Sequence, residues 1–207
     1  ENTHMAAGGV VTEADEHAAL AAAARRARLK VHLDGARLWH ASVALELPPA
    51  ALTVGVDTVQ VCLSKGLGAP VGSVVAGSAE FVEEARRLRK MLGGGVRQGG
   101  VLAAAGLVAL DNVERLAEDH EKAARLAAGL ADRGWRVTEP ATNIVLLSPA
   151  DMPSTLRRLE QAGVLAGPMG GQVRFVTHAD VSEDDIDAVL ARIGPVDAGV
   201  TVPRRPA

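Results

Sequence analysis

The sequence predicts an α/β fold, in which helices cover a sheet, followed by a smaller α+β domain. In the first half, helical and strand-like segments alternate in the order helix, strand, helix, strand, strand, helix, which is typical of a sheet covered by helices. From Trp135 onwards, short strands alternate with helices instead. The hydrophobic content of 48% is sufficient for a packed core, and because aromatic residues make up only 2%, small aliphatic side chains must fill it.

The first half is expected to hold three helices and three strands. An Ala-rich stretch at residues 12–28 favours a helix with Thr12 as its N-cap, and no helix or strand is expected before it. The remaining segments are a strand at residues 30–34, a helix at 36–45, strands at 58–63 and 72–76, and a helix capped by Ser78 that runs to residue 92.

After the run Gly93-Gly94-Gly95, two helices are expected, a small-residue helix at residues 101–110 and a charged amphipathic helix at 112–132. Then come strands at 136–138, 143–147 and 172–177, and helices at 153–162 and 182–193, the last with a capping-box start at Ser182 and Asp185. We expect two domains, residues 1–111 and 112–195, and a disordered tail at 196–207.

Composition and charge restrict the class of protein. A net charge of -3 leaves no basic excess, so neither nucleic acid nor a membrane surface is an expected partner. No apolar run is long enough to span a membrane, and no signal peptide opens the chain. The single cysteine, Cys62, excludes an internal disulfide and fits a reducing compartment. We therefore expect a cytoplasmic protein.

Lys65 is the first candidate for chemistry. It follows a predicted strand and is itself followed by Gly66, Gly68, Pro70 and Gly72. A lysine held partly desolvated at a strand end can act through its neutral amine as a nucleophile towards an aldehyde, and glycines let the backbone approach a flat ring or a phosphate. The alternative is a surface lysine in a tight turn. A dinucleotide-binding loop is excluded by the glycine spacing and by Pro70.

Asp34 is the second candidate, because it ends a predicted strand and Arg37 follows three residues later. A carboxylate at this position can hold the protonated ring nitrogen of a pyridine cofactor. The alternative is a helix N-cap paired with Arg37. His32 and Asp34 share one face of the strand, but no second cluster at ligand spacing exists among the six histidines, so no metal is expected.

Two further segments could bind anions. Residues 90–98 combine three glycines with Lys90 and Arg97, which suits a phosphate or carboxylate; the alternative is a hinge between helices. Arg174 lies inside an apolar strand, where an unpaired charge is costly, so it is expected to meet an anion such as a carboxylate. The alternative is an edge-strand arginine that faces water.

In combination, these segments resemble the threonine aldolase family of pyridoxal-phosphate-dependent enzymes. The resemblance lies in residues 32–39, 62–73, 86–105 and 174–182, in the same order, and residues 1–4 are similar to a segment in the middle of that family's chains. It implies an aspartate-aminotransferase-like fold. Residues 1–111 would be the remainder of a large cofactor-binding domain with a mixed, mostly parallel sheet. We therefore expect a fragment that lacks the family's N-terminal part.

The resemblance also implies roles for individual residues. Lys65 would hold pyridoxal 5'-phosphate covalently and Asp34 would pair with its ring nitrogen. Arg37, beside the cofactor, and Arg174 would bind the carboxylate of an amino-acid substrate. The implied reaction cleaves L-threonine or L-allo-threonine to glycine and acetaldehyde, in a homodimer or homotetramer.

The resemblance implies roles for three further residues. His4 would orient or deprotonate the substrate hydroxyl, and Lys90 and Arg97 would lie near the substrate. Met5 departs from the family, which usually has asparagine there. Two alternatives stay open: another enzyme of the same fold, such as a β-eliminating lyase or an aminotransferase, and an inactive fragment that acts as an interaction module. We expect this polypeptide alone to bind the cofactor poorly.

Overall fold

The protein consists of two compact units, and the computed structural model describes residues 1–196. Unit 1 comprises residues 1–4 and 11–117, and unit 2 comprises residues 5–10 and the chain from residue 118 onwards. Of the predicted tail, residues 197–207 lie outside the described residues. Each unit is treated by itself below.

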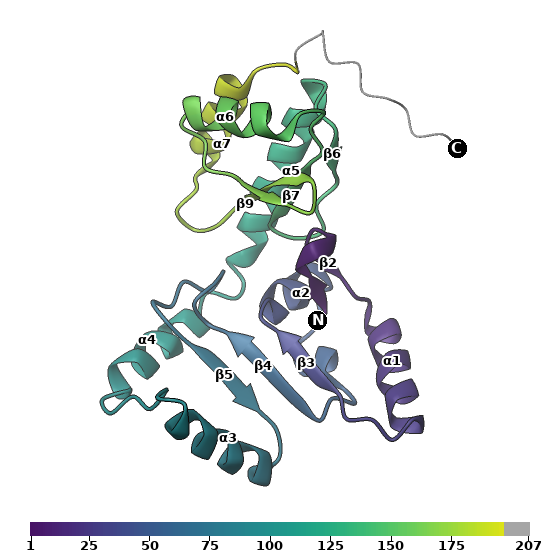
Figure 1. The fold of residues 1–207 in the computed structure, drawn as a ribbon, viewed down its shortest axis with the longest axis vertical. Helices are drawn as coiled ribbons and strands as arrows, with labels where there is room; N and C mark the ends of the chain where they lie inside the picture. The colour runs from purple at the N-terminus through teal and green to yellow at the C-terminus, as the bar shows by residue number, and fades with distance from the viewer. Residues whose placement is uncertain (197–207) are drawn as a thin grey trace. The chain divides into compact units, whose positions relative to one another are not determined.

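Unit 1 is built on a mixed sheet of three strands, β3 (His32–Gly35), β4 (Thr58–Cys62) and β5 (Ser73–Ala76), in that order (Figure 1). β3 and β4 are parallel, with Asp34 opposite Gln60, whereas β5 is antiparallel to β4. Because the carboxyl ends of parallel strands meet at one edge of a sheet, the chain leaves β3 after Gly35 and β4 after Cys62 at the same edge. The predicted α/β class is confirmed.

The helices of unit 1 follow the prediction closely, apart from their first turns. They are α1 (Ala14–Arg26), α2 (Leu38–Ala44), α3 (Ala79–Met91) and α4 (Gly100–Leu110), whereas the 3₁₀ turn η2 (Ala51–Thr53) was not predicted. Ser78 caps α3 as predicted, since its side chain accepts a hydrogen bond from the Phe81 N–H.

The predicted start of the chain is wrong in two respects. The N-cap of α1 is Glu13 and not Thr12, because the Thr12 N–H donates to the Asn2 carbonyl. Two short strands, β1 (Thr3–His4) and β2 (Val10–Val11), and the 3₁₀ turn η1 (Met5–Ala7) also precede α1, where neither helix nor strand was expected.

Two small apolar clusters hold unit 1 together. One contains Leu33, Leu38, Ala41 and Leu52, and therefore packs α2 and η2 against β3. The other contains Leu67, Ala69, Ala109 and Leu116, and it lies under the loop that follows β4. These clusters fix the two strand ends that carry the candidate residues.

The helices α3 and α4 of unit 1 are covered by few other residues. No residue of α3 is buried, and α4 buries only Gly106 and Ala109 although it is apolar around its whole circumference. Val101, Leu107 and Val108 of α4 are 77%, 68% and 68% exposed. An isolated globular unit rarely leaves an apolar helix in this state.

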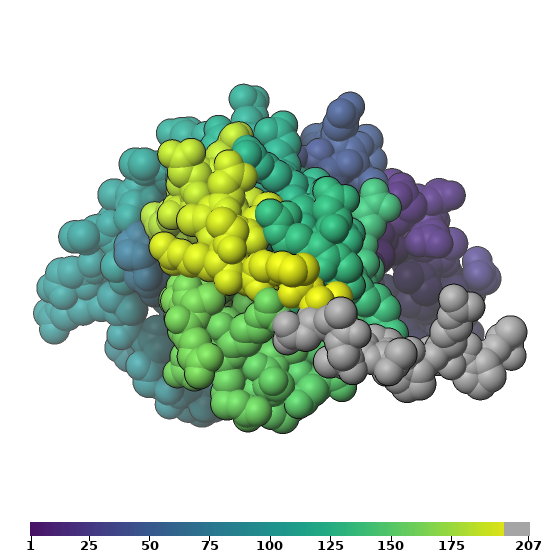
Figure 2. Space-filling model, turned by 90° about the horizontal axis from the view of Figure 1, so that it is seen from above, coloured from purple at the N-terminus to yellow at the C-terminus, as the bar shows by residue number. Residues whose placement is uncertain are grey.

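Unit 2 has an antiparallel sheet of β6 (Val137–Thr138), β7 (Ile144–Leu147), β9 (Gln172–Val176) and β8 (Gly167–Met169), in that order. Its helices are α5 (Leu116–Asp132), of which the first two residues belong to unit 1, α6 (Met152–Gln161) and α7 (Glu183–Ile193). One core joins them, and Figure 2 shows α7 in yellow beside the green residues of α6. The predicted capping box of Ser182 and Asp185 is present.

Two details of this part differ from the prediction. β8 was not expected, and α5 begins at Leu116 rather than at residue 112. Asn112 lies in a turn, where its side chain donates to the Leu67 carbonyl. Within the described residues, no helix combines the length and the apolar character that a membrane crossing requires.

Candidate active site

Asp34 presents a carboxylate on the exposed face of β3, because burial alternates along the strand and Leu33 and Gly35 point inward. Its Oδ1 accepts two hydrogen bonds, from the Ala36 N–H at 3.0 Å and from Gln60 Nε2 at 2.6 Å. Residue 37 occupies the N-cap of α2, so the N-cap alternative for Asp34 is wrong. Within residues 1–196, Oδ2 has no hydrogen-bond donor and can accept one from a ligand.

The surroundings of Asp34 favour its ionised form. Burial raises the pKa of the carboxyl, but the hydrogen bonds from Ala36 and Gln60 and the positive charge of Lys65 act in the opposite direction. Together they outweigh burial, so the pKa lies below its ordinary value. Because the charge of Lys65 affects this pKa, the Lys65 amine and the Asp34 carboxylate lie near each other in unit 1.

Gly35, which follows Asp34, permits a close approach between β3 and β4. A Cβ at this position would lie 2.7 Å from the Gln60 carbonyl oxygen and 3.3 Å from Leu38 Cβ. Only glycine therefore fits between the two strands and the start of α2.

Lys65 lies three residues beyond β4 in a tight turn, with its side chain exposed. The backbone around it is fixed: Trp39 Nε1 donates to the Cys62 carbonyl at 3.1 Å, and the Gly68 N–H donates to the Lys65 carbonyl at 2.9 Å. Leu67 is buried, with 1% of its surface exposed. The exposed lysine in a tight turn, which is the structural alternative, is thus present.

The Lys65 amine and the Asp34 carboxylate fit a pyridine aldehyde cofactor and do not suggest a metal site. The amine of Lys65 has no ion-pair partner among the described residues, and Asp34 keeps one oxygen available for a ring nitrogen. In the same part of the chain, no three His, Cys, Asp or Glu side chains could together hold a metal ion. His32 instead pairs through Nδ1 with Thr58 Oγ1 at 2.8 Å.

The other candidates of unit 1 are less closely tied to this pair. His4 is exposed at the end of β1, and Arg37 is half-buried at the start of α2. Lys90 and Arg97 are exposed at the end of α3 and in the following loop, where Gly93 adopts a φ of +80°. The glycine run connects α3 to α4.

Arg174 lies in unit 2, on a strand that is not at the edge of the sheet. β9 runs between β7 and β8, so the edge-strand alternative is wrong. Its neighbours Val173 and Phe175 are buried on the other face of β9, while Arg174 Nη1 contacts Met5 Sδ at 3.6 Å. A thioether is a weak acceptor and carries no charge, so this contact orients the guanidinium without neutralising it.

Comparison with protein families decides the relationship. The model of the beta-eliminating lyase family matches residues 1–151, which hold Asp34, Lys65 and both anion-binding candidates of unit 1. The chain belongs to this family.

Two curated relatives are named L-threonine aldolases. Low-specificity L-threonine aldolase 1 of Arabidopsis thaliana is 44% identical over 201 residues, which cover 92% of this chain and 56% of that protein. The low specificity L-threonine aldolase of Escherichia coli O157:H7 is 42% identical over 172 residues, or 81% of this chain and 51% of that protein. The chain thus spans about half the length of the curated relatives it matches.

A solved structure shows the same fold at lower identity. A putative L-allo-threonine aldolase from Listeria monocytogenes superposes with a TM-score of 0.77 and 19% identity, covering 93% of this chain and 59% of that one. At this identity the likeness concerns the fold alone.

Sequence reasoning missed the residues that support the pair. Gln60 was treated only as part of a strand, although a polar side chain between Val59 and Val61 signals a specific partner. Asn112 was assigned to a helix, and Arg115 was not singled out at all. Their partners lie 45 and 49 residues away, so no local pattern could identify them.

Proposed function

We propose that the protein to which this chain belongs is a pyridoxal-phosphate-dependent aldolase that cleaves L-threonine or L-allo-threonine to glycine and acetaldehyde. The observation that carries the proposal is the pair of Lys65 and Asp34, an amine and an ionised carboxylate at adjacent strand ends. The names of the Arabidopsis and Escherichia coli relatives support the substrate class. Membership of the beta-eliminating lyase family supports a lyase reaction.

Lys65 and Asp34 would hold the cofactor. The Lys65 amine would bind its aldehyde carbon, and the free Oδ2 of Asp34 would accept a hydrogen bond from the protonated ring nitrogen. When bound, pyridoxal phosphate supplies an electron sink that stabilises negative charge on the α-carbon of an amino acid. Gln60 and the Ala36 N–H keep Asp34 ionised and oriented for this contact.

The remaining candidates would act on the substrate. Arg37 and Arg174 would bind its carboxylate, because a guanidinium matches a carboxylate with two parallel hydrogen bonds. His4 would accept the proton of the β-hydroxyl group, which allows the bond between the α- and β-carbons to break. Lys90 and Arg97 would contribute positive charge near the substrate.

The domain organisation and assembly belong to the same proposal. Residues 1–111 would be the C-terminal part of a large cofactor-binding domain, and residues 112–195 a small domain. The poorly covered helix α4 is consistent with burial in a larger homo-oligomeric assembly. A cytoplasmic location is supported by the single, buried and unpaired cysteine, Cys62.

Reductive labelling of lysine tests the proposal on this chain directly. The chain has only four lysines, so pyridoxal phosphate followed by borohydride and peptide mapping reports on each of them. Two exposed lysines serve as internal standards: Lys30, which is 89% exposed and paired with Asp57 at 2.7 Å, and Lys90, which has no ion pair among the described residues, whereas the side chain of Lys122 is only 9% exposed. We expect Lys65 to be labelled faster than Lys30 and Lys90, even where equilibrium binding is weak.

Two control experiments separate specific binding from simple accessibility. The variant Asp34→Asn keeps the shape of the side chain but removes its charge, and it should abolish the preference for Lys65. Labelling that follows exposure, with Lys30 at least as reactive as Lys65, would contradict the proposal. Product analysis with L-threonine and L-serine distinguishes the aldolase, which gives glycine from both, from a β-eliminating lyase, which gives an oxo acid and ammonia.

A further inference from the structure

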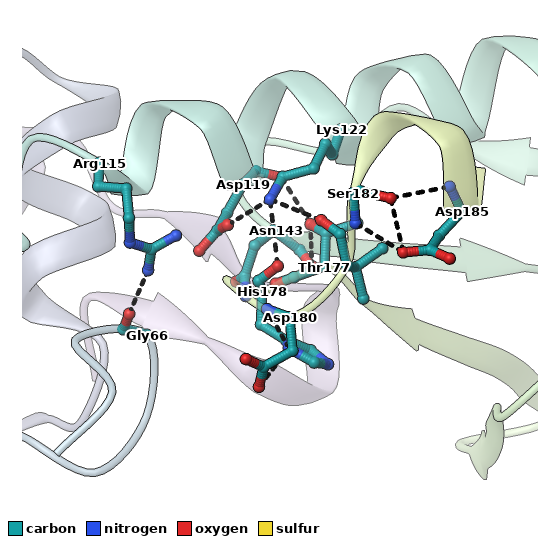
Figure 3. A network of polar contacts seen from close by, with 11 residues as sticks. Gly66, Arg115, Asp119, Lys122, Asn143, Thr177, His178, Asp180, Ser182 and Asp185 are labelled. Carbon is teal, nitrogen blue, oxygen red and sulfur yellow. Dashed lines mark hydrogen bonds and ion pairs between the residues drawn. The ribbon is translucent and has the colours of Figure 1, made fainter. Parts of the chain in front are cut away.

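Two side chains outside the candidate pair bind the backbone directly after Lys65. Both come from the turn between α4 and α5, within unit 1. Arg115 Nη2 donates to the Gly66 carbonyl at 2.7 Å, and Asn112 Nδ2 donates to the Leu67 carbonyl at 2.8 Å. Figure 3 shows the Arg115 guanidinium directed at the Gly66 carbonyl. Two consecutive peptide groups that follow the lysine are therefore held from one side.

At Gly66 this loop has no free space beneath it. A Cβ on Gly66 would lie 2.5 Å from His40 Nε2 and 2.8 Å from Leu116 Cδ2. His40 is buried in α2, which begins only a few residues after Asp34. The peptide of Gly66 is thus enclosed between α2 below and the Arg115 hydrogen bond, so a shift of the loop requires one of these contacts to break.

Lys65 itself has no comparable restraint on its side chain. It is exposed, and no ion pair involves it in the described part of the chain. Its position relative to Asp34 is therefore set by the backbone to which it is attached. A reactive group must be held within a fraction of an ångström of its productive position, and supporting hydrogen bonds provide this precision.

We propose that Arg115 and Asn112 are positioning residues for Lys65. By holding the Gly66 and Leu67 carbonyls, they keep the amine next to Asp34, where it meets the aldehyde of the cofactor. The inference rests on the proposed function, because it assumes that Lys65 is the residue that binds pyridoxal phosphate. Arg115 contributes more than Asn112, since a hydrogen bond from a charged donor is stronger than one from an amide.

The labelling ratio of Lys65 to Lys30 measures this role without any turnover. For Arg115→Ala, we expect the ratio to fall about tenfold, the equivalent of one charge-assisted hydrogen bond. Arg115→Lys should restore part of it, because an ammonium group can still reach towards the carbonyl. Guanidinium chloride at millimolar concentration, compared with an equal concentration of sodium chloride, should restore the ratio in Arg115→Ala and leave the wild type unchanged.

The matched control is Arg125→Ala, which removes an arginine of α5 that is 43% exposed and bound to Glu183 and Asp187. This variant should keep the wild-type ratio. Rescue by guanidinium identifies a local defect, because millimolar guanidinium, a denaturant at molar concentration, would not repair a global loss of structure.

Each outcome has a distinct meaning. If wild-type Lys65 is not preferred over Lys30, the proposed function fails. If Lys65 is preferred and Arg115→Ala keeps the same ratio, the positioning role is refuted and the proposed function stands. Should Arg115→Ala not fold, as judged by circular dichroism, Arg115→Lys and Asn112→Ala decide the matter in the same assay: wild-type ratios in both refute the proposal, and lowered ratios support it.

Discussion

Replacement of Lys122 by methionine should destabilise unit 2 far more than the loss of any exposed charge on the same helix. The Lys122 ammonium pairs with Asp119 at 3.0 Å, and the two side chains are 9% and 0% exposed. Lys122 Nζ also donates to the His178 and Val181 carbonyls at 3.1 and 2.9 Å, so it fixes the loop between β9 and α7 (Figure 3). Methionine replaces the four-carbon stem of lysine with a chain of the same length and removes the terminal ammonium with its charge and donors.

The expected loss of unfolding free energy follows from the buried groups that lose Lys122 as a partner. The substitution leaves the Asp119 carboxylate buried beside its former partner position, together with two carbonyls that lose a donor. Breaking a buried pair on one side costs about 3–5 kcal/mol of unfolding free energy. Arg125→Met removes an arginine from the same helix, but its pairs with Glu183 and Asp187 are exposed, so its expected cost is at most about 1 kcal/mol.

Urea unfolding measures both variants. The chain has two tryptophans, and in a Trp39→Phe background the fluorescence reports on Trp135, which is buried in the core of unit 2. Changing both partners, as in Asp119→Leu with Lys122→Met, should recover part of the loss, because the buried carboxylate is then removed together with the ammonium. Equal midpoints for Lys122→Met and Arg125→Met would refute the argument that burial determines the cost.

Three further predictions concern the candidate site. Gly66→Ala should lower the reductive labelling of Lys65 at least about tenfold, since the added Cβ would meet His40 at 2.5 Å and the loop must move; normal labelling would show that the loop adapts. Gln60→Leu removes a hydrogen bond to ionised Asp34 and should raise the pKa of that carboxyl. The lowered pKa of Asp34 keeps its carboxylate ionised down to more acidic pH. In Gln60→Leu, the acid limb of the Lys65 labelling profile should therefore move to higher pH. An unchanged profile would contradict the role assigned to Asp34. Arg174→Gln in the active assembly should raise KM for L-threonine by about 10–100-fold with a smaller effect on kcat, which steady-state acetaldehyde release measures; an unchanged KM would remove Arg174 from the substrate site.

Periodicity and capping residues predict most of the fold. Helices with a strong apolar pattern or a serine cap, such as α3 and α7, begin within one residue of their predicted start. β4 was predicted from its β-branched run, whereas β8 has the sequence Gly-Pro-Met, which carries no strand signal and forms only because it pairs with β9. β1 and β2 have two residues each and are too short for any pattern.

The positions of Asp34 and Lys65 near strand ends could be predicted from the sequence, whereas the contacts that hold them could not, and their role in a site stays a prediction. Asp34 and Lys65 stand at strand ends, and the resemblance to a family singled them out. The contacts that hold them in place depend on tertiary structure: the Met5 sulfur meets Arg174 across 169 positions of sequence, and the Arg115 guanidinium reaches Gly66 across 49. Asn112 was taken as helical because its neighbours are helix formers, yet its amide satisfies a loop carbonyl instead.

The uncovered helix α4 has a practical consequence for anyone who handles this polypeptide. Association of two molecules removes the exposed leucine and valine side chains of this helix from water, which lowers the free energy. Melting temperatures, sedimentation and dye fluorescence should therefore vary with the amount of protein in the tube. A dilution series is the appropriate first measurement, before any comparison between variants.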